Sequence, residues 1–334
     1  MTEKELHLCL QPGRKIVITS HFNPDGDAIG SALALYKYLT KIGLEASVIV
    51  PNDYPEFLKW LPENDKVRIF EHNSRENSKL VLDADLLFSL DYNDPSRVGN
   101  MEKVLKDTKA KKVLIDHHLQ PNSGFYDMVI STVNTSSTAE LVFDFIKDNF
   151  KQGIDRDIAV CLYTGILTDT GSFSYSCSHA HTFSVVAELF KYGINGEEIH
   201  RKIYSTNSEK RLRLLGYCLR EKLVVINDYV TAYITLTKKE LQEFEYKTGD
   251  TEGVVNYALS IKGIRFAAMF IEKDNKIRIS FRSTGDFSVN EFARKHFEGG
   301  GHKNAAGGDS YDNMDKSVRK FLDLLPHYEQ ELKK

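Results

Sequence analysis

The chain has 334 residues, more than one hydrophobic core usually spans, so we expect two domains of ordinary size. Hydrophobic residues make up 41% and charged residues 27%, which is typical of a soluble globular protein, and no uncharged apolar run is long enough to suggest a membrane partner. The net charge of −3 gives no overall attraction to nucleic acid. We therefore expect no long nucleic acid as a partner, and any such ligand should be short and held locally.

The first residues and the cysteines indicate the compartment. Residues 1–5 carry charges of both signs and no long apolar core follows them, so we expect neither a signal peptide nor a transit peptide. The cysteines lie far apart with no CxxC spacing, which argues against a disulfide scaffold and against a zinc site: Cys9, Cys161, Cys177 and Cys218. A cytoplasmic protein is the simplest expectation.

The first strong pattern joins a strand to a helix. The β-branched run 16–18 predicts a buried strand, Asn23-Pro24 with Gly26 a tight turn, and 28–39 a helix. Gly30, Ala32 and Ala34 leave little side chain on parts of the helix, so we expect the helix to lie close against the sheet.

Three chemistry-bearing side chains lie in that turn. His21, Asp25 and Asp27 would stand at the carboxyl end of a strand, where open α/β sheets build their sites. Carboxylates held close raise one another's pKa unless a cation neutralises them. This cluster therefore favours a divalent metal, and the alternative is a polar turn in which Asp27 caps the helix.

Two later strands end in the same way. A strand is expected at 46–50, another at 86–90 that stops at Asp91, and a third at 112–115 that stops at Asp116-His117-His118. Alternation with helices implies parallel neighbouring strands, so these residues should converge on one edge of one sheet.

Two helices follow. One is expected from Ser137 to Phe150 and opens on a capping-box pattern with Glu140. The next is capped by Asp155, runs to about Leu167 and is ended by the segment 168–171. Asp169 is therefore near the helix C-terminus, where a carboxylate opposes the helix dipole. A metal would explain that cost, and a solvated loop aspartate is the alternative.

Beyond residue 200 the pattern changes. The run 200–222 is basic with leucines at helical spacing, and we expect one helix there that joins two domains. Paired β runs follow at 223–226, 229–235, 264–272 and 276–282, with helices at 238–244, 251–261, 289–296 and 314–332. The second domain should therefore be a mixed α+β domain.

A glycine-rich segment, 299–308, lies within that second domain. Its glycines cost backbone entropy. We expect a loop whose amides approach an anion, as in phosphate-cradling loops, with a flexible loop as the alternative.

These pieces carry a resemblance. In order along the chain they are His21-x-x-x-Asp25-x-Asp27-x-x-Gly30-Ser31, Asp91 after a strand, Asp116-His117-His118, the segment 165–171 and the segment 299–308. Together they resemble the DHH phosphoesterase superfamily, most closely the nanoRNase/pAp phosphatase (NrnA-like) branch. The resemblance implies an α/β catalytic domain with a mainly parallel sheet at 1–195, a helical linker at 196–222, and a smaller mixed-sheet DHH-associated domain that binds substrate at 223–334.

The resemblance also implies two divalent metal ions, most often Mn²⁺. One would be held by His21 and Asp25. The other would be held by Asp27, His117 and Asp169, and Asp91 would bridge both ions.

Further roles follow from the same resemblance. Asp116 would orient an imidazole, and His118 would meet the substrate phosphate. The resemblance assigns the nucleotide's terminal phosphate to the second domain, where its ligands would be Arg282, His302 and the amides of Gly300 and Gly301.

The implied activity is hydrolysis of very short RNA and of the 3′-phosphate of adenosine 3′,5′-bisphosphate (pAp). A homodimer is typical of this kind of protein. Three alternatives stay open: a phosphodiesterase of linear or cyclic dinucleotides, a pyrophosphatase or exopolyphosphatase, and a nucleotide-binding regulator without turnover.

Overall fold

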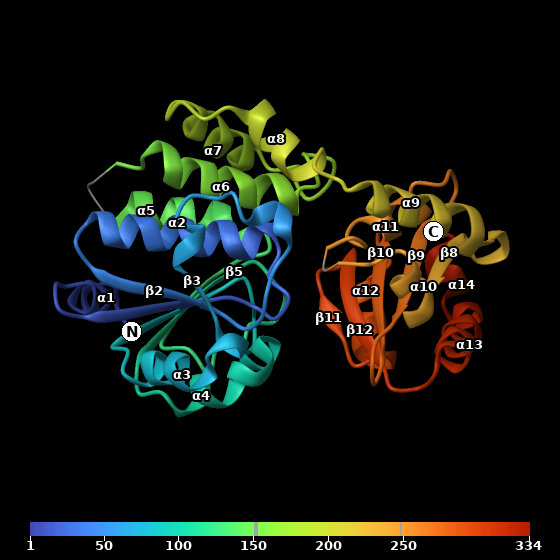
Figure 1. The fold of residues 1–334 in the computed structure, drawn as a ribbon, viewed down its shortest axis with the longest axis horizontal. Coiled ribbons are helices and arrows are strands. Elements are labelled where there is room, and N and C mark those ends of the chain that lie inside the picture. The colour runs from blue at the N-terminus through green and yellow to red at the C-terminus, as the bar shows by residue number, and fades with distance from the viewer. Residues whose placement is uncertain (150–152, 248) are drawn as a thin grey trace. The chain divides into compact units, whose positions relative to one another are not determined.

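The computed structural model describes residues 1–149, 153–247 and 249–334, and the chain forms two compact units, Met1–Thr206 and Asn207–Lys334 (Figure 1). The expectation of one helix over 200–222 is wrong. Helix α8 (Gly196–Tyr204) ends in the first unit, and the side chain of Ser208 accepts a hydrogen bond from Arg211 N and starts α9 (Glu209–Tyr217) in the second. The expected linker therefore divides between the units, and the boundaries 1–195 and 223–334 stay predictions.

The first unit contains a parallel sheet of six strands in the order β3-β2-β1-β4-β5-β6. The strands are β1 (Lys15–Thr19), β2 (Glu45–Val50), β3 (Val67–Ile69), β4 (Leu86–Leu90), β5 (Lys111–Asp116) and β6 (Met128–Ser131). The strand order reverses between β1 and β4, which are hydrogen-bonded neighbours with Thr19 opposite Ser89. In open α/β sheets this reversal point is where ligands bind.

Helices cover both faces of this sheet. Figure 1 shows α2 (Gly26–Lys41), α5 (Thr138–Asn149) and α6 (Arg156–Asp169) over one face, and α3 (Ser74–Leu82) and α4 (Glu102–Asp107) over the other. Alternate residues of β1 point to opposite faces of the sheet. Ile16 and Ile18 pack in the core with the first group of helices, and Val17 packs in the core with the second. The expected strands and helices of this part are confirmed, except that the predicted end at Phe150 lies outside the described residues.

The remaining elements of the first unit are short or peripheral. Figure 1 shows α7 (Ala180–Phe190) and α8 outside α6, on the side away from the sheet. The others are α1 (Glu3–Cys9) and the 3₁₀ turns η1 (Glu56–Leu58), η2 (Asn64–Lys66), η3 (Phe70–His72) and η4 (Pro95–Met101). Among the described residues of the chain, no helix combines the length and the apolar character needed to cross a bilayer.

Helices α2 and α6 approach each other more closely than side chains would allow. A Cβ placed at Gly30 would lie 2.5 Å from the carbonyl oxygen of Cys161, and one at Gly26 would lie 2.3 Å from Oγ1 of Thr168. Gly30 therefore does not have the expected role of bringing the helix close to the sheet, because its α-carbon faces α6. The contact brings the start of α2 against the end of α6, and so places Asp169 beside the His21–Asp27 turn.

The second unit is built on a mixed sheet in the order β11-β12-β10-β9-β8-β7. Only the pair of β8 and β9 is parallel. The strands are β7 (Leu223–Ile226), β8 (Thr231–Leu236), β9 (Phe266–Glu272), β10 (Ile277–Ser283), β11 (Gly300–Gly301) and β12 (Ala305–Ser310). The mixed α+β fold expected for this half of the chain is confirmed.

Strand β9 is buried on both faces and joins two cores. Phe266 and Phe270 pack in the core that contains Phe292 of α12 (Val289–His296) and Phe321 of α13 (Met314–Leu324). Met269 points to the opposite core, with residues of α9, α10 (Lys238–Glu243) and α11 (Val254–Leu259). Short elements complete the unit: the π-turn η5 (Cys218–Lys222), η6 (Asn227–Tyr229), η7 (Leu325–Tyr328) and α14 (Glu329–Leu332). The helix expected over 314–332 is thus broken at η7, where Pro326 lies at its start.

The glycine-rich segment forms strands, so the expectation of a loop throughout is wrong. Gly300 and Gly301 pair with Gly307 and Ala306 across β11 and β12. A Cβ at Gly299 would lie 2.0 Å from the carbonyl oxygen of Gly307. Glycine is therefore required here by the close approach of two backbones.

The glycine contact between α2 and α6 predicts a stability effect. Gly30→Ala should lower the free energy of unfolding by about 1–3 kcal/mol, because the obstructing Cys161 oxygen is backbone and cannot turn away. Denaturant unfolding followed by circular dichroism measures this. Gly216→Ala in α9 is the control, since among the described residues a Cβ there meets nothing within 4 Å outside its own helix. Equal stability of the two variants would contradict the prediction.

Candidate metal centre

Five elements of the first unit deliver polar side chains to the reversal point of the sheet. His21 follows β1, Asp91 follows β4, and His117 follows β5. Asp27 lies in the first turn of α2, and Asp169 is the last residue of α6. Residues up to 148 positions apart in the sequence thus meet within one unit (169 − 21 = 148).

One group of potential ligands contains His21, Asp25 and Asp91, with ligand atoms within 4.8 Å of one another. Nε2 of His21 lies 3.4 Å from Oδ2 of Asp91 and 3.8 Å from Oδ2 of Asp25. Nδ1 of His21 lies 2.9 Å from the carbonyl oxygen of Phe22, which directs Nε2 toward the carboxylates. This is the residue set predicted for one metal ion.

Asp25, and not Asp27, caps helix α2. Its Oδ1 accepts hydrogen bonds from the backbone N–H groups of Asp27 (3.0 Å) and Ala28 (3.1 Å) at the start of α2. The interpretation of Asp27 as the cap of its own helix is therefore wrong. Asp25 fixes one oxygen on the helix and turns the other toward His21.

The second group contains Asp27, His117 and Asp169. Nε2 of His117 lies 3.4 Å from Oδ2 of Asp169 and 3.7 Å from Oδ2 of Asp27. It is also 3.3 Å from Oδ1 of Asp91. Asp91 therefore offers one oxygen to each imidazole and stands between the two groups, as the prediction of a bridging carboxylate requires.

The backbone at Asp91 is itself unusual. Asp91 has φ +64°, in the left-handed region that only a few residue types adopt readily. Its N–H is held by the carbonyl oxygen of Ile115 at 3.1 Å. Such strain is retained where the surrounding structure over-determines a residue, and here it directs the carboxylate between His21 and His117.

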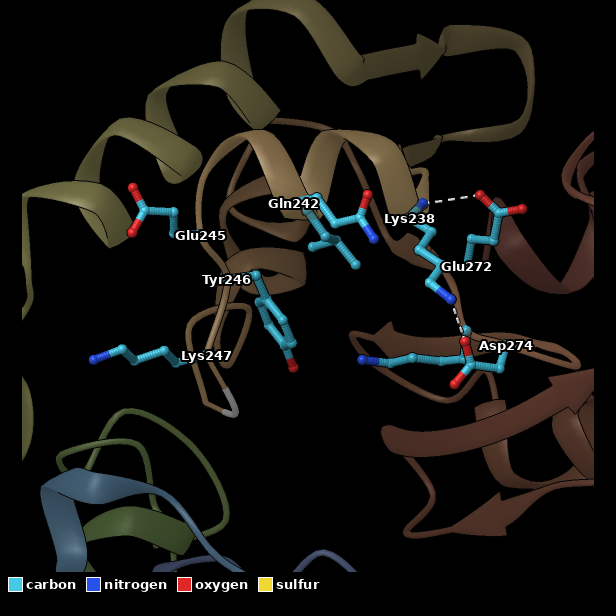
Figure 2. Close-up of a pocket in the computed structure, with 9 residues that line it drawn as sticks. Lys238, Gln242, Glu245, Tyr246, Lys247, Glu272 and Asp274 are labelled. Atoms are coloured by element: carbon cyan, nitrogen blue, oxygen red, sulfur yellow. Dashed lines mark hydrogen bonds and ion pairs between the residues drawn. The ribbon is translucent and has the colours of Figure 1, made fainter.

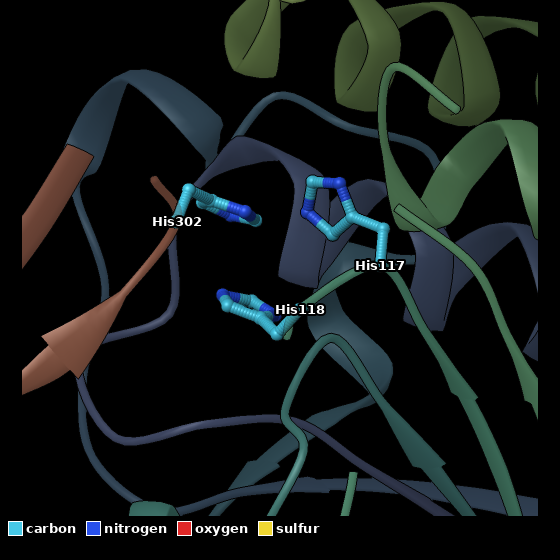
Figure 3. A group of neighbouring side chains, drawn as sticks. All are labelled: His117, His118 and His302. Carbon is cyan, nitrogen blue, oxygen red and sulfur yellow. The ribbon is translucent and has the colours of Figure 1, made fainter. Parts of the chain in front are cut away.

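Asp116 and His118 form a contact of their own beside the two groups. Nδ1 of His118 lies 2.7 Å from Oδ1 of Asp116, and the His118 N–H donates to Oδ2 at 3.1 Å. Figure 3 shows the rings of His117 and His118, which follow β5 directly and meet edge to face with centroids 5.1 Å apart. Asp116 thus fixes the ring of His118, while their parts in a reaction remain predictions.

Several carboxylates lie close together in the centre, and their burial and mutual repulsion shift their pKa values. Burial raises the pKa of Asp27 well above its usual range, and the charges of Asp91 and Asp169 raise it further. Burial likewise raises the pKa of Asp169 and of Asp116 to about 7. Burial disfavours the charged form of Asp91 too, but hydrogen bonds from His117 and His21 outweigh it and hold its pKa well below normal.

The imidazoles respond in the opposite sense. Burial opposes the charge on His117, but the carboxylates of Asp169, Asp91 and Asp27 outweigh it and raise its pKa to about 10. The pKa of His21 is raised in the same way by Asp91 and Asp25. The protein therefore gathers negative charge that protons only partly offset, and the carboxylate and imidazole donors fit hard to borderline divalent cations.

Two residues at this edge were not identified from the sequence. Thr138, at the start of α5, donates from its Oγ1 to Oδ1 of Asp91 at 3.0 Å. Arg97 acts on both His21 and Asp116, since its charge lowers the pKa of each, and its carbonyl oxygen accepts the N–H of Phe22 at 2.7 Å. Thr138 lies within the segment 136–140, whose sequence pattern indicates only a helix cap. Arg97 lies in η4, after Asp91, and no sequence pattern singles it out.

The residues predicted to bind phosphate lie together within the second unit. Arg282 on β10 pairs with Ala305 on β12, and the carbonyl oxygen of Ala305 accepts the N–H of His302 at 2.7 Å. The N–H of Gly301 donates to Oδ1 of Asn290 at 3.0 Å. The amide of Gly301 therefore already has a side-chain partner. Donation of a hydrogen bond to an anion by Gly300 or Gly301 stays a prediction.

A pocket of about 570 Å³ also lies in the second unit, and Figure 2 shows its lining. Lys238 reaches Asp274 and donates its N–H to Glu272, and Lys273 lies 4.6 Å from the centre of the Tyr246 ring. The lining contains none of the residues predicted for metal or phosphate binding.

Comparison with known families divides the chain in the same order as the motifs. The profile of the DHH family, N-terminal domain, matches residues 15–166, and that of the DHHA1 domain matches residues 227–331. The "Bifunctional oligoribonuclease and PAP phosphatase NrnA" of Thermus thermophilus is 31% identical, over 95% of this chain and 88% of its own length. The protein of the same name from Bacillus subtilis is 28% identical, over 92% and 93%.

Comparison with solved structures finds the same fold in other proteins. An exopolyphosphatase-related protein of Bacteroides fragilis is 40% identical, covers 99% of this chain with 97% of its own, and superposes with a TM-score of 0.91. RecJ of Thermus thermophilus in complex with Mn²⁺ is 13% identical and shares the fold, with a TM-score of 0.56 over 98% of this chain and 54% of its own. This chain belongs to the DHH family of phosphoesterases, in the NrnA-like branch that joins a DHH domain to a DHHA1 domain, and it is a hydrolytic enzyme.

Proposed function

We propose that this protein hydrolyses very short oligoribonucleotides to mononucleotides and removes the 3′-phosphate of pAp, the activities for which its relatives from Thermus thermophilus and Bacillus subtilis are named. The observation that carries the proposal is a pair of ligand groups with Asp91 between them: Asp91 belongs to the group of His21, and its Oδ1 lies 3.3 Å from Nε2 of His117 in the other group. A shared carboxylate is the arrangement expected of a two-metal phosphoesterase.

We propose two divalent cations, most simply Mn²⁺, as the cofactors. His21, Asp25 and Asp91 would hold one, and Asp27, His117, Asp169 and Asp91 would hold the other. Bound there, two such cations would lower the pKa of a water molecule and would offset negative charge on phosphoryl oxygens. No cysteine belongs to either described group, and the oxygen and imidazole donors suit manganese.

The other residues would bind and orient the substrate. Because Nδ1 of His118 is directed to Asp116, its Nε2 is the atom proposed to meet the scissile phosphate. Arg282 would bind a remote phosphate through its planar guanidinium, with His302 from the adjacent turn as a second donor. The near-neutral chain supports a short substrate, because a long polyanion would favour an extensively basic surface. The cytoplasmic location and the homodimer stay predictions.

Turnover on a substrate panel tests the proposal directly. The panel contains a diribonucleotide, a longer RNA, pAp, a cyclic dinucleotide and polyphosphate, each with added Mn²⁺ and after chelation. Metal-dependent release of mononucleotide from the diribonucleotide, together with dephosphorylation of pAp, is the expected result. Turnover of polyphosphate alone would instead favour the activity suggested by the name of the Bacteroides fragilis protein.

Removing the shared charge should abolish activity. Asp91→Asn keeps the side-chain shape and a residue type that tolerates the left-handed backbone, yet it removes the anion offered to both groups. We expect turnover to fall by at least about a thousandfold with the thermal unfolding midpoint largely unchanged. Asp94→Asn, in the same turn but outside both groups, is the control and should change turnover little. Wild-type turnover in Asp91→Asn would contradict the shared-carboxylate assignment.

Metal binding should release protons. Without metal, His117 is held protonated at pH 7 by its raised pKa of about 10, and burial raises the pKa of Asp27 and Asp169 toward the protonated form. Metal ligation needs the deprotonated forms, so affinity for Mn²⁺ should rise from pH 6 to pH 8. Calorimetric titration at one pH in two buffers of different ionisation enthalpy measures the release. A heat that does not depend on the buffer would contradict the expectation.

Arg282 should act on binding more than on chemistry. Arg282→Ala is expected to raise KM for pAp or a diribonucleotide while leaving turnover of a small activated phosphodiester nearly unchanged, because that diester lacks the remote phosphate. Arg278→Ala, four residues earlier on β10 and paired with Asp309, is the matched control. An equal loss on both kinds of substrate would place Arg282 at the reacting phosphate.

A further inference from the structure

Thr138 contacts two carboxylates that belong to different elements. It is fully buried and is the first residue of α5. Its backbone N–H donates to Oδ2 of Asp27 at 2.7 Å, and its Oγ1 donates to Oδ1 of Asp91 at 3.0 Å. One residue thus joins a carboxylate of α2 to the carboxylate that follows β4.

The contact with Asp27 is part of a larger arrangement. The N–H of Ala139 donates to Oδ1 of Asp27 at 2.8 Å, and Oγ of Ser31 donates to the same oxygen at 3.2 Å. The start of α5 is therefore capped by an aspartate from another helix. The two N–H donors fix the orientation of that carboxylate relative to α5.

The contact with Asp91 matters most when cations are present. In the arrangement described, Asp91 accepts from Thr138 and also lies within 3.4 Å of Nε2 of His21 and of His117. An imidazole that ligates a cation through Nε2 no longer donates a proton from that atom. The Thr138 hydroxyl belongs to neither ligand group and keeps its proton, so it can still donate to Asp91 when cations are bound.

Thr138 is itself held in place by its neighbours. The carboxylate of Glu140 accepts hydrogen bonds from Ser136 N (3.1 Å), Ser136 Oγ (2.5 Å) and Oγ1 of Thr182 in α7 (2.8 Å). The Glu140 N–H donates to Oγ of Ser137 at 3.2 Å. The turn before Thr138 is thus fixed on both sides, so its hydroxyl is presented from a rigid element.

We infer that Thr138 is a positioning residue that sets the separation of the two cation sites, by holding Asp27 through its N–H and Asp91 through its hydroxyl. The inference rests on the proposed two-metal function and adds to it a residue outside the ligand set. Partners that orient metal ligands typically change metal affinity about 10–100-fold when they are removed.

The test compares Thr138→Val, which removes the hydroxyl and keeps the shape, with Thr138→Ser, which keeps the hydroxyl. Thr164→Val is the matched control, because Thr164 is a fully buried threonine of α6 whose Oγ1 has no hydrogen-bond partner among the described residues. Mn²⁺ binding is measured without substrate, by electron paramagnetic resonance of the free ion, and kcat and KM are then measured on the diribonucleotide.

We expect Thr138→Val to weaken Mn²⁺ binding at least about tenfold and to lower kcat more than it changes KM. Thr138→Ser should stay within about threefold of the wild type, and Thr164→Val should match the wild type. If Thr138→Val fails to fold by circular dichroism, Thr138→Ala removes the same hydroxyl without adding a methyl group and takes its place.

Equal Mn²⁺ affinity in the wild type, Thr138→Val and Thr164→Val would overturn the inference, as would an equal loss in Thr138→Val and Thr138→Ser. The metal titration uses no substrate, so the two proposals can fail separately. A wild type that binds Mn²⁺ but cleaves neither the diribonucleotide nor pAp would contradict the proposed substrates while the titration still decides the role of Thr138.

Discussion

The metal centre of the first unit depends on holding several carboxylates close together, two of them almost out of contact with water. Asp27 and Asp91 are almost fully buried, and Asp169 lies beside the imidazole of His117. Each carboxylate makes the ionisation of the others less favourable. Imidazoles and the N–H groups at the start of α5 offset part of this cost. A pair of divalent cations would offset the remainder, which is why this arrangement suits metal-dependent hydrolysis.

The fold supplies the precision that such a centre needs. Adjacent parallel strands β1 and β4 bring His21 and Asp91 to one edge in matching register. The close contact at Gly30 brings the end of α6, and with it Asp169, to the start of α2. The ligands come from regular elements or follow them directly, and rigid elements hold side chains more accurately than long loops do.

The second unit is predicted to bind a phosphate, and its architecture differs from that of the metal centre. Its glycine-rich segment is a pair of strands in which backbone approaches backbone, and the tight packing places the turn at His302 next to Arg282. An aromatic-rich core packs on one face of β9 and a mostly aliphatic core packs on the other. The two cores together stabilise the sheet. The two units correspond to the DHH and DHHA1 domains that the family models match at 15–166 and 227–331.

The sequence by itself determined the family, the two kinds of sheet and the residues that gather at the edge, because strand ends followed by His and Asp are local patterns. It did not reveal that Asp25 rather than Asp27 caps α2, that Gly30 faces α6, that residues 200–222 form two helices, or that Thr138 joins two carboxylates. The contacts of Gly30 and Thr138 join segments up to 135 positions apart (Gly30 and Gly165; 165 − 30 = 135), so only the tertiary packing decided them. The caps at Asp25 and Ser208 are local, and there the sequence offered more than one capping side chain or helix boundary.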